Sequence, residues 1–337
     1  MPLLDTGYHH YDETYLGVWY RRAVISWNGM RALLANKWVK RIVGVCWLLC
    51  FVQTAVLFAI GQLLVPESFI NDYLGMLGRG EQSFVGRIEE WLTEHPEVSV
   101  HTIYNFLFFQ FANWISFFSY VLLAIVVPQL ITIDFSSRAL LVYSSKALNR
   151  FDYFLGKFGI AFGMLTCVWL GPILVAWFFG NLLAPDWTFF IHSSRALANV
   201  VLYVVSSMAI LSLIALGVSA CSAKEKATTS LWIGFWIVGG VFGQIGGFTK
   251  PWLQNISIAH NLDQLAVYVF RLKQDLYAAA EVVPGIGKSL ANFDKIPAHA
   301  KPPFLRDPEM EGAMVGLVLM VGIALLIVTR KVRPEST

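Results

Sequence analysis

The residue types that carry most enzyme and metal chemistry are scattered along this chain. Two of the seven histidines, His9 and His10, lie at the N-terminus. No two of the others show ligand spacing on one predicted element, so a metal site would need residues that only the fold brings together. The patterns GxSxG and HExxH are absent. We therefore expect no catalytic residue and no metal ligand. The other five histidines are His95, His101, His192, His260 and His299.

The segment 285–289 ends in the Gly-Lys-Ser of a phosphate-binding loop. In the full pattern GxxxxGK[ST], the first glycine would fall at Val282. The loop also requires a preceding apolar strand and a following long helix, and the sequence predicts neither. We expect this chain to bind no nucleotide and no other cofactor.

The cysteines lie within or at the ends of apolar stretches, where an oxidising compartment would not pair them. Cys46 and Cys50 are four residues apart and share a helix face, so they are most simply small packing residues. The other two are Cys167 and Cys221.

The composition indicates a chain that lies mostly in lipid. Of the 337 residues, 56% are hydrophobic, 15% are aromatic and only 14% are charged, whereas soluble domains contain about 25% charged residues. This composition excludes a soluble enzyme, a secreted disulfide scaffold and a disordered chain. The net charge of +3 is too small to indicate nucleic-acid binding.

Six stretches without charged residues are long enough to cross a bilayer, which requires about 20 apolar residues. We predict an all-α polytopic membrane protein with a transmembrane domain at 42–329. A cytoplasmic N-terminus at 1–41 precedes this domain, and a basic tail at 330–337 follows it. The predicted spans are 42–66, 104–130, 158–183, 196–223, 227–249 and 312–329.

Basic residues predict the orientation of the spans. With both termini and the loop 134–157 inside, the cytoplasmic side holds 15 Lys and Arg residues and the other side holds 10. Seven of those 10 fall in the long segment 250–311, where the positive-inside rule has least force. We therefore expect a protein of the cell (inner or plasma) membrane, with both termini cytoplasmic and outer loops at 67–103 and 250–311.

The outer segment 250–311 begins with apolar residues at helical spacing and then becomes rich in proline and lysine. Its first half is predicted to be a helix that is either re-entrant or interfacial, and its second half a surface loop. The other outer loop, 67–103, is acidic.

The residues before the first span predict an amphipathic helix in the headgroup region, because tryptophans and apolar residues recur at helical spacing with basic residues between them. The alternative is an ordinary flank of the first span whose basic side chains reach the membrane surface. The residues that define this helix are Trp19, Arg21, Arg22, Trp27, Arg31 and Trp38.

Between the second and third spans, 134–150 predicts a short cytoplasmic helix of about 14 residues in which apolar and basic positions alternate. Such a helix suits a groove on a cytoplasmic partner. The alternative is a passive helix lying on the membrane. The residues we expect to carry partner contact are Asp134, Phe135, Arg138, Leu140, Tyr143, Lys146 and Arg150.

This segment resembles the corresponding loop of type-2 ATP-binding-cassette (ABC) exporter permeases. The resemblance rests on Asp134, Arg138-Ala139-Leu140, Tyr143-x-Ser145-Lys146 and Asp152-Tyr153-x-x-Gly156-Lys157. Many relatives have proline where this chain has Ala147. The resemblance implies that 134–150 is a coupling helix and that the amphipathic helix before the first span is an elbow helix.

The resemblance also implies the partners and the function. A separate ATPase subunit would bind ATP and Mg, and a second permease copy, identical or similar, would complete the translocation path. Two other interpretations remain open: a non-transporting membrane anchor or assembly protein, and a secondary transporter. The absence of ionisable residues from the spans weakens the secondary-transporter interpretation.

Two further features concern helix packing. Glycines at helical spacing, such as Gly159 and Gly163 or Gly312 and Gly316, let helices approach closely in lipid. We favour packing within the chain over a homodimer seam. Polar residues inside the spans, including Asn181, are expected to form hydrogen bonds between helices more often than substrate contacts.

Overall fold

The computed structural model describes residues 17–62, 91, 94–137, 149–184, 186–282, 290–293, 295–296 and 301–331. Every regular element in these ranges is a helix. Within them, six helices are long and apolar enough to cross a membrane, which confirms the predicted multi-pass architecture. They are α2 (Lys37–Gln62), α5 (Pro96–Val126), the continuous α8 (Arg150–Leu165), η2 (Thr166–Leu170) and α9 (Gly171–Leu182), α10 (Thr188–Ser219), α11 (Glu225–Phe248) and α15 (Met310–Lys331).

Four of these helices begin well before their predicted starts. α2 begins at Lys37 instead of 42, α5 at Pro96 instead of 104, α8 at Arg150 instead of 158, and α10 at Thr188 instead of 196. The predicted spans were limited by charged and polar residues. A helix continues past such residues, because long charged side chains extend from its ends to a polar environment. Pro96 suits the first turn of α5, where no backbone N–H is needed for a helical hydrogen bond.

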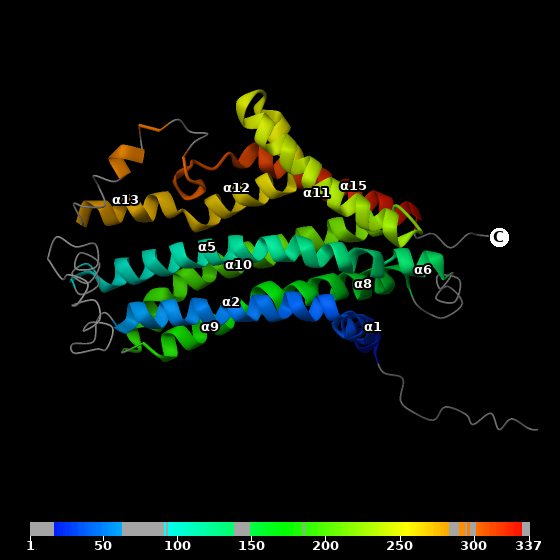
Figure 1. Ribbon diagram of the computed structural model, residues 1–337, viewed down its shortest axis with the longest axis horizontal. Coiled ribbons are helices and arrows are strands. Elements are labelled where there is room, and N and C mark those ends of the chain that lie inside the picture. The colour runs from blue at the N-terminus through cyan, green and yellow to red at the C-terminus, as the bar shows by residue number, and fades with distance from the viewer. Residues whose placement is uncertain are drawn as a thin grey trace, which may run out of the picture.

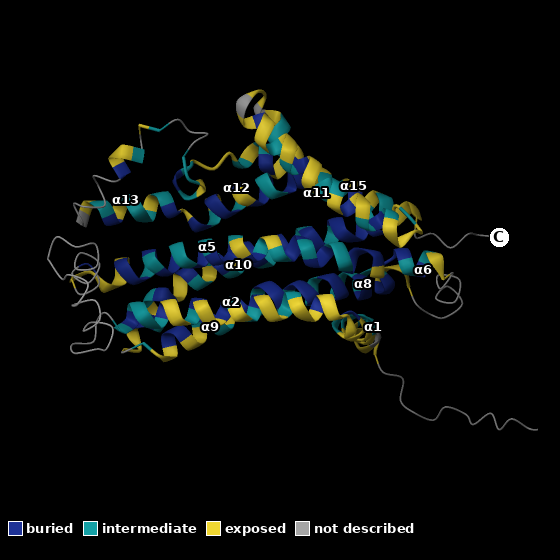
Figure 2. Ribbon diagram, viewed as in Figure 1, coloured by how far each residue is buried: buried dark blue, intermediate teal, exposed yellow. Residues whose placement is uncertain are grey.

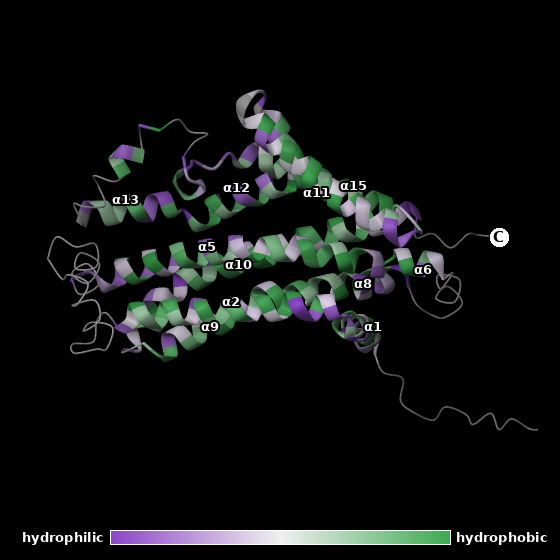
Figure 3. Ribbon diagram, viewed as in Figure 1, coloured by the Kyte–Doolittle hydropathy of each residue, from purple (hydrophilic) through white to green (hydrophobic). Residues whose placement is uncertain are grey.

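The long helices form an elongated bundle in which α2, α5, α8–α9 and α10 run side by side, with α11 and α15 leaning across them (Figure 1). Large aromatic side chains fill the centre, among them Trp169, Tyr203 and Phe108. Residues on the outward sides of α2, α11 and α15 are exposed (Figure 2), and these helices are largely hydrophobic (Figure 3). An apolar exterior of this extent fits lipid better than water.

The third crossing contains a wide π-helical segment, η2, which ends two residues before Pro172. Proline lacks the N–H that would continue the α-helical pattern, so nearby carbonyls need other donors. The indole Nε1 of Trp47 donates to the Cys167 carbonyl at 3.2 Å, and the Cys50 thiol donates to the Pro172 carbonyl, also at 3.2 Å. α2 therefore satisfies backbone groups at the irregular turn of its neighbour.

Helix α1 (Val18–Ala35) lies across one end of the bundle at a steep angle to the long helices (Figure 1). It packs closely on α8 through glycines: a Cβ added at Gly159 would be 2.2 Å from Ser26 Oγ, and one added at Gly156 would be 2.7 Å from Ile25 Cγ2. Gly163 makes the same kind of contact with Met30. These contacts confirm packing within the chain for the Gly159 and Gly163 pair.

The other glycine stripes also pack within the chain. On α15, Gly312 and Gly316 contact Asn255, which belongs to η3 (Pro251–Ile256). On α11, Gly243 faces Ser257 and Gly246 faces Gln254. After α11 the chain therefore turns back and runs along the end of that helix, and α15 packs against this turn.

From Ser257 the chain continues as α12 (Ile258–Phe270) and α13 (Leu272–Val282), toward the end of the bundle opposite α1 (Figure 1). These helices confirm the predicted helical first half of 250–311. Arg271 joins them in the left-handed conformation, with φ 51°. Asn105 of α5 fixes the joint, because its Nδ2 donates to the Phe270 carbonyl and to Asp275 Oδ2, both at 2.7 Å.

We expect Gly159→Leu to separate α1 from α8, because the new side chain would occupy the position of Ser26. Overpacking of this kind costs about 1–3 kcal/mol, so the melting temperature of the purified chain in detergent should fall. Gly44→Leu is the matched control, since nothing lies within 4 Å of a Cβ at Gly44. An equal change in both variants would contradict the close packing of α1 on α8.

Candidate functional site

The short helix α6 (Thr132–Ser136) follows α5 through the turn η1 (Val127–Gln129) and carries a buried ion pair. Lys157 Nζ of α8 lies 2.6 Å from Asp134 Oδ2, and each side chain is only 8% exposed. The Tyr153 hydroxyl donates to the same oxygen at 2.6 Å. A carboxylate with a cation and a hydroxyl donor is compensated despite its burial. The pair therefore fixes α6 to the first turns of α8.

A second ion pair attaches α1 to α8. Arg22 Nε donates to Asp152 Oδ1 at 2.7 Å, and the Ser26 hydroxyl donates to the Gly156 carbonyl at 2.9 Å. Asp152 is adjacent in sequence to Tyr153, so the two ion pairs occupy neighbouring positions at the start of α8. Movement of α6 relative to α8 would therefore be transmitted toward α1.

Hydroxyl groups connect α6 to two further helices. Thr132 Oγ1 donates to the Ser219 carbonyl at 2.7 Å, and Ser219 Oγ at the end of α10 accepts from the Thr132 amide at 3.1 Å. Thr132 Oγ1 also lies 3.0 Å from Thr228 Oγ1 in the first turns of α11. We call the whole set the α6 junction: Arg22, Thr132, Asp134, Asp152, Tyr153, Lys157, Ser219 and Thr228.

The structure describes some of the residues predicted to contact a partner. Asp134 lies in the α6 junction, Phe135 is partly buried against the core, and Arg150 is the exposed first residue of α8. Segment 138–148 lies outside the described residues, and with it Arg138, Leu140, Tyr143 and Lys146. This segment is the connection between α6 and α8, so both of its ends are held at the α6 junction.

Asp152, Tyr153 and Lys157 belong to the sequence run that resembles ABC permeases, but the sequence did not predict them as site residues. Charged residues at the boundary of an apolar span are the signal that could have indicated them, because such groups usually pair when they become buried. Thr132, Ser219 and Thr228 gave no signal in the sequence.

The predicted amphipathic helix exposes its tryptophans. Trp19 is 75% exposed and Trp27 is 65% exposed. Arg31 is also exposed, whereas Arg22 is engaged with Asp152. Arg21 lies in α1, but its side chain is outside the described part of the structure.

Trp38 belongs to α2 and not to the predicted amphipathic helix. Asn36 ends α1 in an extended conformation with ψ 130°, and its side-chain oxygen accepts from the Trp38 amide at 2.9 Å. A side-chain oxygen that accepts from the amide two residues later caps the start of a helix, so Asn36 also begins α2. Trp38 is 63% exposed, so it still presents an aromatic side chain beside α1.

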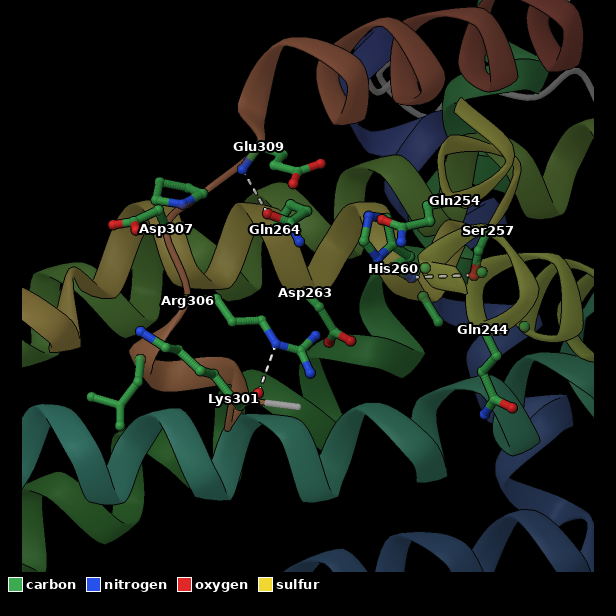
Figure 4. A pocket seen from close by; sticks show the side chains of 16 residues that line it. Gln244, Gln254, Ser257, His260, Asp263, Gln264, Lys301, Arg306, Asp307 and Glu309 are labelled. Atoms are coloured by element: carbon green, nitrogen blue, oxygen red, sulfur yellow. Dashed lines mark hydrogen bonds between the residues drawn. The ribbon is translucent and has the colours of Figure 1, made fainter. Parts of the chain in front are cut away.

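A pocket of about 850 Å³ lies between α11, α12 and segment 301–309, which contains the short 3-10 helix η5 (Pro303–Leu305). We call it the α12 pocket. Its α11 wall is formed by Gly240, Gly243, Gln244 and Gly247, which leave space because three of the four have no side chain. Polar and charged side chains from the other elements point into it (Figure 4). The main ones are Gln254, His260, Asp263, Gln264, Lys301, Arg306 and Glu309.

The surroundings of the α12 pocket shift the pKa values of two ionisable groups. Asp263 is accessible from the pocket, yet burial raises its pKa from 3.8 to about 6, against the opposing charge of Arg306. Burial lowers the pKa of His260, which the charge of Glu309 opposes. The Gln264 side chain accepts from the Glu309 amide at 2.8 Å and so holds 301–309 against α12.

Two of the polar residues inside the spans form hydrogen bonds between helices. Asn199 donates to Asn105 of α5 at 3.3 Å, and Asn181 accepts from Ser193 of α10 at 3.2 Å. These contacts confirm interhelical hydrogen bonding for the two residues. Gln244, by contrast, lines the α12 pocket.

Comparison with known proteins gives no family for this chain. No protein-family model and no curated protein matches it. The function therefore has to be argued from its residues and their geometry.

We expect Lys157→Met to destabilise the fold by about 3–5 kcal/mol, because Asp134 would remain buried without its cation. The double variant Asp134→Asn, Lys157→Met should recover much of this loss, since no buried charge remains. Thermal unfolding of the two single variants and the double variant measures the coupling. Additive effects would show that the pair is not coupled.

Lowering the pH from 7.5 to 5 should raise stability through Asp263. Its pKa of about 6 in the folded chain exceeds its ordinary 3.8, so in this window the folded state binds more protons than the unfolded state. Other groups facing the pocket are His260, Lys301, Arg306 and Glu309. Asp263→Asn should flatten the dependence of the melting temperature on pH, and an unchanged slope would contradict the assignment.

Proposed function

We propose that this chain is the transmembrane permease subunit of an ATP-driven ABC exporter of the type-2 class. In this proposal the α1 end of the bundle faces the cytoplasm, and a separate ATPase subunit docks on residues 134–150. The ATPase binds ATP and Mg, and this chain supplies the translocation path together with a second, identical or similar copy.

The observation that supports the proposal best is the α6 junction. A force applied to segment 138–148 would reach α6 and α8 together, because Asp134 joins the two ends of the segment through Lys157 and Tyr153. From there, hydrogen bonds at Thr132 lead to α10 and α11, and the Arg22 ion pair leads to α1. Such a connection is what rigid-body gating by a partner requires.

The exposed face of α1 fits the membrane position that the proposal needs. Trp19 and Trp27 are exposed beside basic residues, and aromatic and basic side chains together favour the headgroup region. α1 would then lie at the inner membrane surface and move with α8, to which it is bound.

Replacing the proposed contact face by alanine at Phe135, Arg138, Leu140 and Tyr143 tests the proposal. We expect the ATPase to co-purify with the tagged wild-type chain from its native host and to be lost from the variant. ATP hydrolysis by the reconstituted complex should be stimulated by cargo, because cargo bound in the translocation path would act on the ATPase through segment 134–150. Trp187→Ala is the control, since it changes an exposed aromatic residue between α9 and α10.

The outcomes separate the remaining interpretations. Full retention of the ATPase by the alanine variant would contradict docking at 134–150. A stable complex whose ATP hydrolysis never responds to cargo would favour a membrane anchor or assembly protein. Uptake or export that requires an ion gradient and no ATPase would favour a secondary transporter.

A further inference from the structure

The α12 pocket has the size of a small-molecule site. Its volume of about 850 Å³ lies within the range of about 300–1,000 Å³ typical of ligand pockets. A water molecule or a single metal ion would leave most of it empty. Within the described residues, no group of three or more His, Cys, Asp or Glu side chains could hold a metal ion. The ligand that this pocket fits is therefore a molecule with several polar groups.

Two carboxylates give the pocket an acidic side. Asp263 and Glu309 line it, and neither carboxylate forms an ion pair or accepts a hydrogen bond within the part of the chain that the structure describes. The third lining carboxylate, Asp307, differs, because Lys273 Nζ lies 2.7 Å from one of its oxygens. Asp263 and Glu309 are both exposed at the pocket, so their carboxylates are open to a cationic group on a ligand, and the charge of Arg306 also acts on Asp263.

Two cations give the same pocket a basic side. Arg306 and Lys301 both line it from segment 301–309. Arg306 Nε donates to the Lys301 carbonyl at 2.8 Å, which fixes the guanidinium at the pocket wall. Figure 4 shows the Arg306 and Asp263 side chains directed into the same region of the pocket. Guanidinium groups suit phosphate and carboxylate oxygens, so the ligand carries an anionic group as well as a cationic one.

The lining also indicates which kind of cation fits. Quaternary ammonium groups are usually held by aromatic side chains, and the described residues around this pocket include no Phe, Tyr or Trp. Carboxylates and the amides of Gln244 and Gln254 instead accept N–H hydrogen bonds. A primary ammonium group satisfies these acceptors better than a quaternary one.

The α11 wall continues into an exposed apolar stripe. Ile237, Val241 and Ile245 lie at four-residue intervals on α11, and Ile237 is three residues before Gly240. These side chains are 55%, 50% and 47% exposed, respectively. A ligand with its polar group in the α12 pocket could therefore lay apolar tails along this stripe.

We propose that the α12 pocket binds the phosphoethanolamine group of a zwitterionic amphiphile, with the ammonium at Asp263 and Glu309 and the phosphate at Arg306 and Lys301. Both a phospholipid headgroup and free phosphoethanolamine carry this chemistry. The site does not depend on the transport proposal, because binding is measured without an ATPase or nucleotide.

Native mass spectrometry of the purified full chain in detergent tests this site. The probes are dioleoyl phosphatidylethanolamine, the same lipid with a choline or a glycerol headgroup, and free phosphoethanolamine. We expect one ethanolamine lipid per chain, bound about tenfold more tightly than either of the other lipids, which is the difference expected for one charge-assisted contact. Equal affinity for the three headgroups would overturn the proposal.

Variants locate the binding. Asp263→Asn and Glu309→Gln should each weaken ethanolamine-lipid binding about tenfold. Glu281→Gln is the matched control, because Glu281 is an exposed carboxylate on α13 outside the pocket lining. Unchanged affinity in both pocket variants would overturn the proposal, and two variants guard against the misfolding of one. Competition by free phosphoethanolamine would identify a soluble ligand, and its absence a lipid.

Discussion

The buried contact between Asp134 and Lys157 is the interaction on which the α1 end of the bundle depends. Two charges in a site that is only 8% exposed lose most of their hydration, and they remain acceptable only while they compensate each other. Tyr153 adds a hydrogen bond to the same carboxylate oxygen. The positions of α6 and α8 are therefore coupled, because displacing either one would leave a charge without a partner in an apolar surrounding.

The helix packing next to this ion pair is also close. α1 rests on α8 through Gly156, Gly159 and Gly163, none of which has space for a Cβ. Small residues allow helix backbones to approach where lipid provides no hydrophobic driving force. The Arg22–Asp152 pair then fixes the angle at which α1 crosses the bundle. Charge pairing and glycine packing together make this end a single mechanical unit.

The opposite part of the bundle is held together by different contacts. There the chain folds back along α11, and α12 and α13 meet at Arg271 in a left-handed conformation that Asn105 stabilises from α5. Glycines on α11 support this fold in two ways: Gly243 and Gly246 admit the returning chain, and Gly240 leaves open space beside Asp263. One end thus holds its buried charges in compensating pairs, whereas the other retains the larger polar pocket.

The sequence by itself determined the six apolar helices and the helical start of 250–311, because hydropathy and periodicity are local properties of a chain. It also placed Asp134, Tyr153, Gly156 and Lys157 in one recognisable run. It could not show that Thr132 bonds to Ser219, which is 87 residues away, or that Gly240 and Asp263 share a pocket. It also placed Trp38 in the wrong helix, since hydropathy and periodicity do not show the break at Asn36, whose side-chain oxygen accepts from the Trp38 amide. Such contacts depend on how helices are rotated and stacked against one another, and only the tertiary structure decides that.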